Sequence, residues 1–287
     1  MSIKVIGLNH RYKAGTPFEK QALFEINLEI EAGEFLGLIG PSQAGKTTLA
    51  QYFNALHLPA QGRVLINGQD TGNRKTDLTA IRRSVGYVFQ NPDCQLFKPT
   101  VGEDIAFGPA NQRCSRAEIS ERVRESMATV GLDYGIYHKR NIFALSGGQK
   151  RRAAIAGVLA CRPQTLILDD ITAGLDPQGR EEILEVVGKL HRDKKMTVVF
   201  ISSNMDDLSR LAKRIVVMHR GKIVMDGAAR EIFACVQQLK HLCLQPPQIM
   251  DIIYRLKQRG FSVPLSALTL EEALEIICAA LKQRGAG

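Results

Sequence analysis

The sequence predicts an α/β fold with a mostly parallel sheet at its centre. Several short apolar runs, rich in β-branched and aliphatic residues, show little alternation, which is typical of strands covered on both faces. These runs are Phe35 to Gly40, Val85 to Gln90, Thr165 to Asp169 and Thr197 to Ser202. Helical patterns lie between some of them, at 145–161 and 177–195. Strands that alternate with helices indicate the α/β layout, and 287 residues allow one large domain with a small appendix.

Three further segments complete the predicted architecture. The first residues of the chain, to about position 35, alternate more strongly and indicate an antiparallel β layer. Residues 92–140 are polar and helical in character and predict a helical subdomain. Residues 214–227 indicate a hairpin that turns at Arg220 and Gly221.

The character of the sequence changes after Cys235, which predicts two domains: residues 1–235 and a small α-helical domain at 236–287. Pro246 and Pro247 interrupt the chain near the start of the second domain. Thr269 and Glu272 have the spacing of a capping box at the start of a final helix. The apolar stripe of that helix consists of Leu270, Leu274, Ile277 and Leu281.

Composition narrows the environment more than the activity. The net charge of +9 suits nucleic acid, an anionic membrane surface or an acidic protein partner, and does not choose among them. Six scattered cysteines without a C-x-x-C pair indicate reduced, packed thiols rather than zinc or redox chemistry. The sequence shows neither a signal peptide nor an apolar run of the roughly 20 residues that span a bilayer, so we expect a cytosolic protein.

The stretch "GPSQAGKTT" predicts a phosphate-binding loop, because it fits G-x-x-x-x-G-K-T and lies between a strand and a helix. Glycines let backbone N–H groups surround phosphates, and the helix N-terminus adds its positive dipole end. Lys46 is expected to reach the β- and γ-phosphates, and Thr47 to offer its hydroxyl to Mg²⁺. The residues expected to bind nucleotide here are Gly40, Pro41, Ser42, Gln43, Ala44, Gly45, Lys46, Thr47 and Thr48.

A carboxylate at the end of a buried strand supplies the second half of a magnesium site. Asp169 closes the apolar run "TLILD", where a Walker-B aspartate holds Mg²⁺, commonly through water. The phosphate-binding loop and this aspartate together predict binding of a nucleoside triphosphate with Mg²⁺; that the nucleotide is ATP is implied only by the family resemblance that the next motif carries.

The stretch "LSGGQKRR", shortly before that strand, makes the resemblance specific. With "GPSQAGKTT" and "LILDD" in this order, residues 3–227 resemble the ATP-binding-cassette (ABC) ATPases. The resemblance implies that Tyr12 stacks on adenine and that Gln90 senses Mg²⁺ and the attacking water. It also implies that Asp176, in "AGLD", belongs to the D-loop that contacts the opposite subunit.

In that family the nucleotide lies between two subunits, so a single chain holds no complete site. The signature residues are therefore expected to serve a partner's ATP. They are Ser146, Gly147, Gly148 and Gln149. Backbone N–H groups at a helix start are chemically suited to meet a γ-phosphate.

The stretch "VFQNPDCQLF", the single cassette and the segment after Pro246 resemble the ATPase subunits of energy-coupling factor transporters, which power uptake of vitamins or of cobalt and nickel ions. The resemblance implies a second ATPase subunit, a transmembrane coupling subunit and a substrate-binding membrane subunit. It places the chain peripherally on the cytoplasmic face of the membrane. It also implies that 91–97 contribute to the groove for coupling helices. For the final helix it favours dimerisation, with packing on its own domain as the alternative.

Two departures from the family pattern concern catalysis. Asp170 stands where most active members have the glutamate that polarises water, and its carboxylate is one methylene, about 1.5 Å, shorter; a misplacement near 1 Å reduces rates by as much as ~100-fold. Ser203 stands where the family has a histidine that contacts the γ-phosphate. Gln43 is a weaker departure in a loop richer in glycine elsewhere. We therefore predict a slow site on this chain's own loop and a heterodimer with a better-equipped subunit; a homodimer in which aspartate suffices remains open.

The runner-up is a soluble cassette ATPase that works on the ribosome or on nucleic acid. Such proteins carry two cassettes or a long coiled coil, and this chain has neither. The arginines at 82, 83, 151 and 152 are interpreted as phosphate-facing, interface or solvated residues, so no nucleic-acid partner is expected. A P-loop kinase has no use for "LSGGQ". The transported substrate is not encoded in this chain.

Overall fold

The computed structural model describes residues 2–285. Within them lies a six-stranded sheet in the order β10-β9-β3-β8-β7-β6. The strands are β3 (Phe35–Ile39), β6 (Val85–Val88), β7 (Thr165–Asp169), β8 (Thr197–Ile201), β9 (Arg214–His219) and β10 (Lys222–Ala228). Every residue of β3, β7 and β8 is buried, which explains their lack of alternation. The predicted parallel pairing is confirmed for β9-β3-β8-β7-β6.

The predicted hairpin and antiparallel layer are also present. Strands β9 and β10 pair in antiparallel fashion, and Arg220 and Gly221 both have positive φ, 47° and 77°. Such a turn matches the twist of the flanking strands. A second, antiparallel sheet has the order β2-β1-β4-β5. Its strands are β1 (Ile3–Tyr12), β2 (Lys20–Ile30), β4 (Gln61–Ile66) and β5 (Gln69–Asp70).

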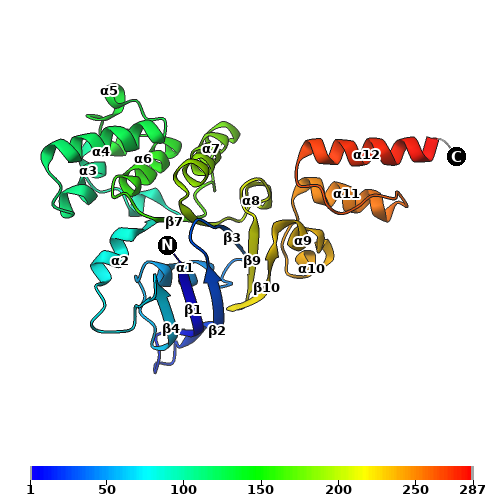
Figure 1. The fold of residues 1–287 in the computed structure, drawn as a ribbon, viewed down its shortest axis with the longest axis horizontal. Coiled ribbons are helices and arrows are strands. Elements are labelled where there is room, and N and C mark those ends of the chain that lie inside the picture. The colour runs from blue at the N-terminus through cyan, green and yellow to red at the C-terminus, as the bar shows by residue number, and fades with distance from the viewer. Residues whose placement is uncertain (1, 286–287) are drawn as a thin grey trace.

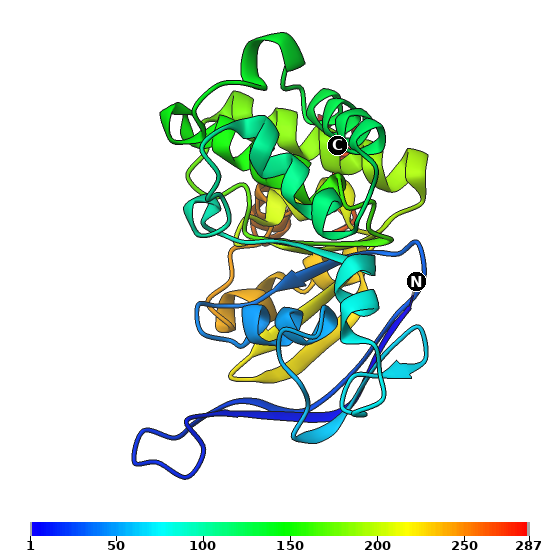
Figure 2. The same ribbon diagram turned by 90° about the vertical axis from the view of Figure 1, so that its left-hand side faces the viewer.

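Helices cover the central sheet and extend the molecule at both ends of its long axis (Figure 1). Those near the sheet are α1 (Lys46–Phe53), α2 (Leu78–Ser84), α7 (Pro177–Lys194), α8 (Met205–Leu211), α9 (Ala229–Ala234) and α10 (Val236–His241). The helical subdomain holds η1 (Pro92–Cys94), α3 (Val101–Asn111), α4 (Arg116–Thr129), α5 (Tyr134–Tyr137), η2 (Ile142–Ala144) and α6 (Gly147–Leu159). Figure 2 shows this subdomain above the antiparallel layer.

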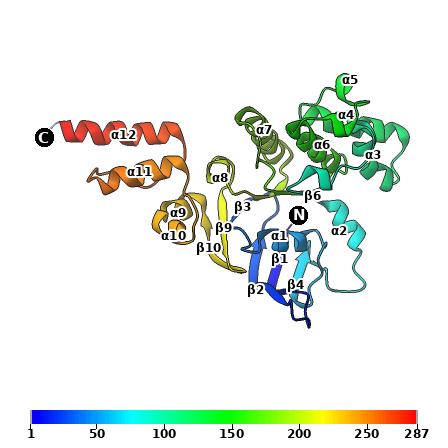
Figure 3. The ribbon, with the colours of Figure 1, turned by 180° about the vertical axis from the view of Figure 1, so that it is seen from behind.

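The far end of the molecule is formed by α11 (Gln248–Gln258) and α12 (Leu270–Gly285), which lie side by side (Figures 1 and 3). They share a small core of their own, made of Ile253, Val263, Ala267, Ala273 and Ala280. The side chains of Val236, Leu239, Leu244 and Met250 belong instead to the main core. The segment that opens the predicted second domain is therefore packed on the first.

The final helix turns its apolar stripe outward. Thr269 Oγ1 accepts from the backbone N–H of Glu272, and the Glu272 carboxylate accepts from that of Thr269, which confirms the capping box. Leu270, Leu274 and Leu281 are 70%, 61% and 55% exposed, whereas the small Ala273 and Ala280 face α11. No helix within residues 2–285 has the length and apolar content needed to cross a bilayer.

Candidate active site

The phosphate-binding loop leaves β3 and enters α1, and two of its glycines are required by their surroundings. A Cβ on Gly40 would lie 2.3 Å from the carbonyl oxygen of Met218, and one on Gly45 would lie 2.8 Å from that of Ala22. Both glycines also have positive φ. The backbone of the loop is therefore held tightly between the two sheets.

The lysine of the loop is half-buried beside two carboxylates. Lys46 Nζ donates to the carbonyl oxygens of Gly40 (2.8 Å) and Pro41 (3.0 Å). Burial lowers the pKa of Lys46, while the negative charges of Asp170 and Asp169 act in the opposite direction. The loop carbonyls therefore orient the Lys46 ammonium, which lines the same cavity as Asp169 and Asp170.

The three residues predicted to hold magnesium, Thr47, Gln90 and Asp169, line the same cavity, and the Thr47 side chain lowers the pKa of the Asp169 carboxyl. Asp169 is only 4% exposed, and its Oδ2 accepts a 2.7 Å hydrogen bond from the Tyr87 hydroxyl. Burial raises the pKa of Asp169, and the bonds from Tyr87 and Thr47 oppose that shift. A hydroxyl beside a buried carboxylate is the kind of hard oxygen donor set that Mg²⁺ prefers, so these residues fit the ion that the fold implies.

The three predicted catalytic side chains, Asp170, Gln90 and Ser203, converge at the ends of β7, β6 and β8. Asp170 Oδ1 accepts from Ser203 Oγ (3.0 Å) and from the Ser203 backbone N–H (3.2 Å). Asp170 Oδ2 accepts from Gln90 Nε2 at 3.3 Å. Asp170 itself has a positive φ of 48°, unusual for a residue with a side chain. Both carboxylate oxygens are therefore engaged within this chain.

Tyr87 is a functional residue that sequence reasoning missed. In the parallel register it lies opposite Ile167, so its side chain leaves the sheet on the same face as that of Asp169, two residues on. Burial and the charge of Asp169 both raise the pKa of Tyr87, so it acts as a neutral donor. The sequence "VGYVF" alone does not indicate this role, because it depends on β6 lying beside β7 in the sheet.

We expect Tyr87→Phe to lower the free energy of unfolding by about 1–3 kcal/mol, because a buried carboxylate loses its donor. Urea unfolding checks this. The matched control is Tyr254→Phe, since the Tyr254 hydroxyl is also part of a side-chain hydrogen bond, but accepts it from Gln237 Nε2 and does so at the exposed surface. Equal effects of the two substitutions would show that the Tyr87 hydroxyl does not support Asp169.

Arg151 is the second residue whose role the sequence did not reveal. The sequence leaves it among phosphate-facing, interface or solvated arginines, whereas it is 8% exposed and donates to the carbonyl oxygens of Gln90 and Ala173. Burial lowers its pKa, and the charge of Asp170 opposes this shift. Arg151 thus joins the Gln90 segment to the D-loop. Arg152 instead pairs with Glu182 at the surface.

A cavity of about 660 Å³ lies on the Tyr12 side of the loop. Tyr12 is 39% exposed, and its hydroxyl is hydrogen-bonded to Thr48 Oγ1 at 2.9 Å. The hairpin turn at 219–221 also lines this cavity, and the Gly221 N–H donates to Ala44 O. Lys20 enters from β2 and donates to the Gln43 side chain. The aromatic face of Tyr12 and the loop therefore border the same space.

A cavity of about 450 Å³ lies on the opposite side of the loop. Among its walls are Lys46, Thr47, Asp169 and the catalytic group of Gln90, Asp170 and Ser203. Residues from the chain beyond α10 also line it. The two cavities, together called the groove, adjoin along the loop, because five of its residues border both: Pro41, Ser42, Gln43, Lys46 and Thr47.

The signature residues lie elsewhere and border neither cavity. Ser146 is the N-cap of α6, and with Gln149 it forms a capping box. A Cβ on Gly147 would meet nothing within 4 Å, and one on Gly148 would meet only Leu175 at 3.9 Å. Asp176 is the N-cap of α7 and accepts from the Gly179 N–H. No packing contact among residues 2–285 requires glycine at position 147.

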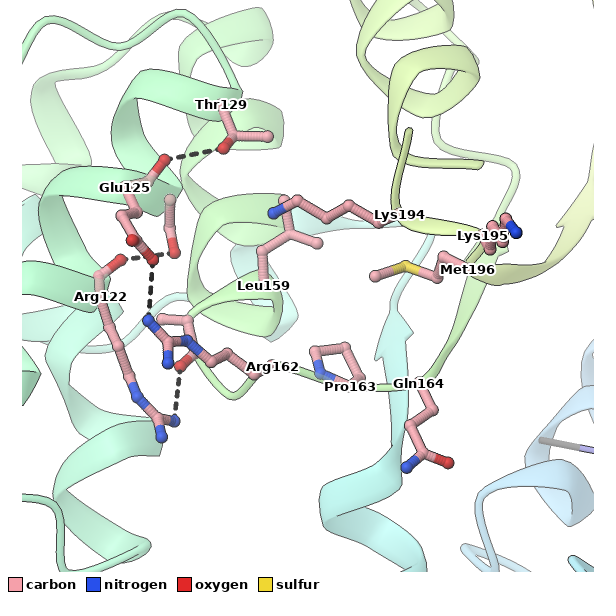
Figure 4. A pocket seen from close by; sticks show the side chains of 12 residues that line it. Arg122, Glu125, Thr129, Leu159, Arg162, Pro163, Gln164, Lys194, Lys195 and Met196 are labelled. Carbon is pink, nitrogen blue, oxygen red and sulfur yellow. Dashed lines mark hydrogen bonds and ion pairs between the residues drawn. The ribbon is translucent and has the colours of Figure 1, made fainter. Parts of the chain in front are cut away.

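Two other surface features stand apart from the loop. A cavity of about 580 Å³, shown in Figure 4, lies between the ends of α4 and α6 and the α7–β8 turn. Two of its cations are engaged, Arg122 with Glu118 and Arg162 with Glu125. Beside η1, Phe97 and Phe107 are 55% and 39% exposed and meet edge to face, with the Lys98 ammonium over both rings.

Comparisons with known proteins agree with this geometry. The sequence profile of the ABC transporter family matches residues 23–173. The chain is 47% identical over 277 residues to the energy-coupling factor transporter ATP-binding protein EcfA2 of Clostridium perfringens, covering 96% of this chain and 97% of that one. Among solved structures it resembles cbiO1 of Clostridium perfringens, described as part of the ABC transporter complex cbiONQ, with 35% identity and a TM-score of 0.72 over 83% of this chain and 93% of that one. It also resembles the dimeric ATP-binding cassette MJ0796 in a post-hydrolysis state bound to ADP and Pi, with 29% identity and a TM-score of 0.71 over 79% and 98%.

Proposed function

The chain belongs to the ATP-binding proteins of energy-coupling factor transporters, within the ABC transporter family, and from that premise we propose that it powers import of a vitamin or a transition-metal ion as one half of an unequal ATPase pair. ATP occupies the groove with its base on Tyr12 and its phosphates on residues 40–48. The site built on this chain's phosphate-binding loop is called its own site. Hydrolysis is slow at the own site and fast at the second site, which the signature of this chain completes in the partner.

The observation that carries this proposal is the hydrogen bonding of the Asp170 carboxylate. A general base must present a lone pair to the water that it deprotonates, at hydrogen-bond distance. Here Oδ1 accepts two bonds from Ser203, Oδ2 accepts one from Gln90, and the side chain is one methylene shorter than glutamate. Ser203 cannot carry a positive charge to the γ-phosphate. The own site is suited to hold a triphosphate and poorly suited to cut it.

A second, better-equipped ATPase subunit is the proposed partner. Clostridium perfringens supplies an EcfA2 at 47% identity to this chain and a cbiO1 at 35%, as expected of two distinct ATP-binding subunits in one organism. The dimeric state of MJ0796 supports pairing of two cassettes. The open space around Gly147 suits the close approach of a partner's γ-phosphate to a helix N-terminus.

Mg²⁺ would be held at the own site by Thr47 and Asp169, with Gln90 beside it. When bound, the ion supplies charge neutralisation between the β- and γ-phosphate oxygens. Tyr87 and the buried end of β7 fix the Asp169 carboxylate for this task, and Lys46 contributes a point charge to the same phosphates.

Two exposed apolar surfaces suit protein partners. The aromatic pair Phe97 and Phe107 is proposed to receive the transmembrane coupling subunit, which would in turn hold the substrate-binding membrane subunit. The stripe of Leu270, Leu274 and Leu281 is proposed to meet the partner ATPase, because this chain leaves it uncovered. The chain would then lie peripherally on the cytoplasmic face of the membrane. A role on ribosomes or nucleic acid is set aside, because relatives that align over nearly the whole chain are named as transporter subunits.

Steady-state ATPase measurements test the proposal. We expect the purified chain alone to turn over roughly 10–100-fold more slowly than the chain combined with a second ATP-binding subunit of the same genome, the loss associated with a misplaced base. Fast turnover by the chain alone, unchanged in Ser203→Ala, would remove the asymmetry.

A further inference from the structure

The segment of residues 242–247, here called the connector, joins α10 to α11 and is fixed to the catalytic domain at both ends. The Leu244 side chain is buried in the main core, and its N–H donates to Leu239 O at 2.9 Å. Pro246 and Pro247 are buried as well. The Gln248 N–H donates to Asp206 Oδ1 at 2.8 Å. The connector is therefore packed on and hydrogen-bonded to the catalytic domain.

This anchoring places the connector beside the catalytic side chains. Asp206 lies in the first turn of α8, three residues after Ser203. Cys243 has a positive φ of 58°, which turns the backbone sharply between α10 and the buried Leu244. The two exposed side chains of the connector are Cys243 and Gln245, and both line the 450 Å³ cavity that also contains Asp170 and Ser203.

The arrangement of the groove indicates which part of the nucleotide meets the connector. Tyr12 borders only the 660 Å³ cavity, whereas Asp170, Ser203 and Gln245 border only the 450 Å³ cavity. Lys46 borders both. A nucleotide with its base on Tyr12 thus directs its terminal phosphate past Lys46 toward the space that the connector closes.

Gln245 has the chemistry to recognise that phosphate. Its amide offers two N–H donors without a charge, in a cavity that already contains the Lys46 cation and two carboxylates. It also has two more carbons of reach than serine, which matters because Ser203 is committed to Asp170. A neutral donor at this place contributes only when a terminal phosphate is present.

We propose that Gln245 donates a hydrogen bond to the γ-phosphate of ATP at the own site, so that the C-terminal helices distinguish the triphosphate from the diphosphate. This proposal rests on the nucleotide orientation given under Proposed function. Because Gln245 is followed at once by two buried prolines and α11, a change at the phosphate is transmitted to the helix pair that carries the exposed leucine stripe.

Binding of fluorescent ATP and ADP analogues, with Mg²⁺, to the full chain tests the proposal. We expect Gln245→Ala to weaken the ATP analogue about tenfold, the scale of one hydrogen bond to a charged group, and to leave the ADP analogue unchanged. The matched control is Gln248→Ala, an exposed glutamine three residues on that does not line the cavity. Equal losses for both nucleotides, or no loss for either, would overturn the proposal.

The Cys243 thiol provides a second readout that needs no substitution. A non-hydrolysable ATP analogue should slow alkylation of Cys243 by iodoacetamide more than ADP does, with exposed Cys94 as the internal reference in peptide mass spectra. Identical protection by the two nucleotides would contradict a γ-phosphate contact. Lys46→Ala tests nucleotide binding at this chain's loop separately from the Gln245 contact. It should abolish binding of both nucleotides; if it does not, the proposed nucleotide site is wrongly placed.

Discussion

The double substitution Asp170→Glu with Ser203→His raises ATP turnover of the isolated chain about 10–100-fold, on the expectation that geometry alone limits its own site. Glutamate restores the missing methylene, and histidine removes the hydroxyl that binds Asp170 Oδ1 while offering a donor for the γ-phosphate. Affinity for the ATP analogue should change little, because Lys46 and the loop backbone are untouched. The measurement is steady-state phosphate release with saturating MgATP.

The single substitutions resolve which defect dominates. Asp170→Glu alone should give part of the gain, because the Ser203 backbone N–H still binds the carboxylate. Adding Lys46→Ala to the double variant should abolish the new activity, which locates it at this chain's own loop. If the double variant binds MgATP normally yet stays as slow as the parent, a misplaced base is not the reason for slow turnover.

Much of the fold was predictable because the sequences of β3, β7 and β8 show that these strands are buried on both faces. Strands covered on both faces carry continuous apolar runs, and the residue that ends each run marks the carboxyl edge of the sheet. The loop at 40–48 and Asp169 could be placed together for that reason, whereas Asp170 and Ser203 stand out only as departures from the family pattern. The side-chain assignments of Gln90 and Tyr12 rested on the family resemblance, and their roles remain predictions.

The parts that sequence did not reveal depend on contacts between distant segments. Tyr87 supports Asp169 from a neighbouring strand, a relation fixed by strand order rather than by spacing. Arg151 resembles any arginine of a polar helix until its carbonyl partners are known. Gln245 follows α10 at the start of a predicted separate domain, and only packing of Leu244 and Met250 into the main core brings it to the catalytic cavity.

Gly147→Ala should separate the folding of this chain from its service to the partner. The position is the first residue of α6, and an added Cβ meets nothing within 4 Å. Alanine is favoured over glycine in helices, so the free energy of unfolding should be unchanged or rise by up to about 1 kcal/mol. A methyl group where the γ-phosphate must approach the N–H groups should nevertheless lower turnover at the partner's site on the order of 100-fold, the scale of a lost oxyanion donor.

The matched control for this experiment lies on the same helix. Gly157 also has space for a Cβ, which would meet only Ile105 Cα at 4.0 Å, so Gly157→Ala should stabilise α6 in the same way. It lies inside the helix, about three turns from the signature, and should leave turnover of the pair unchanged. ATPase assays of the reconstituted pair, beside urea unfolding of each single chain, give both readouts. A stable Gly147→Ala chain that supports full turnover would mean that α6 does not face a partner's phosphate. The added methyl group meets no atom within 4 Å in the described part of this chain, so a change in this chain's own packing could not mask its effect on the partner.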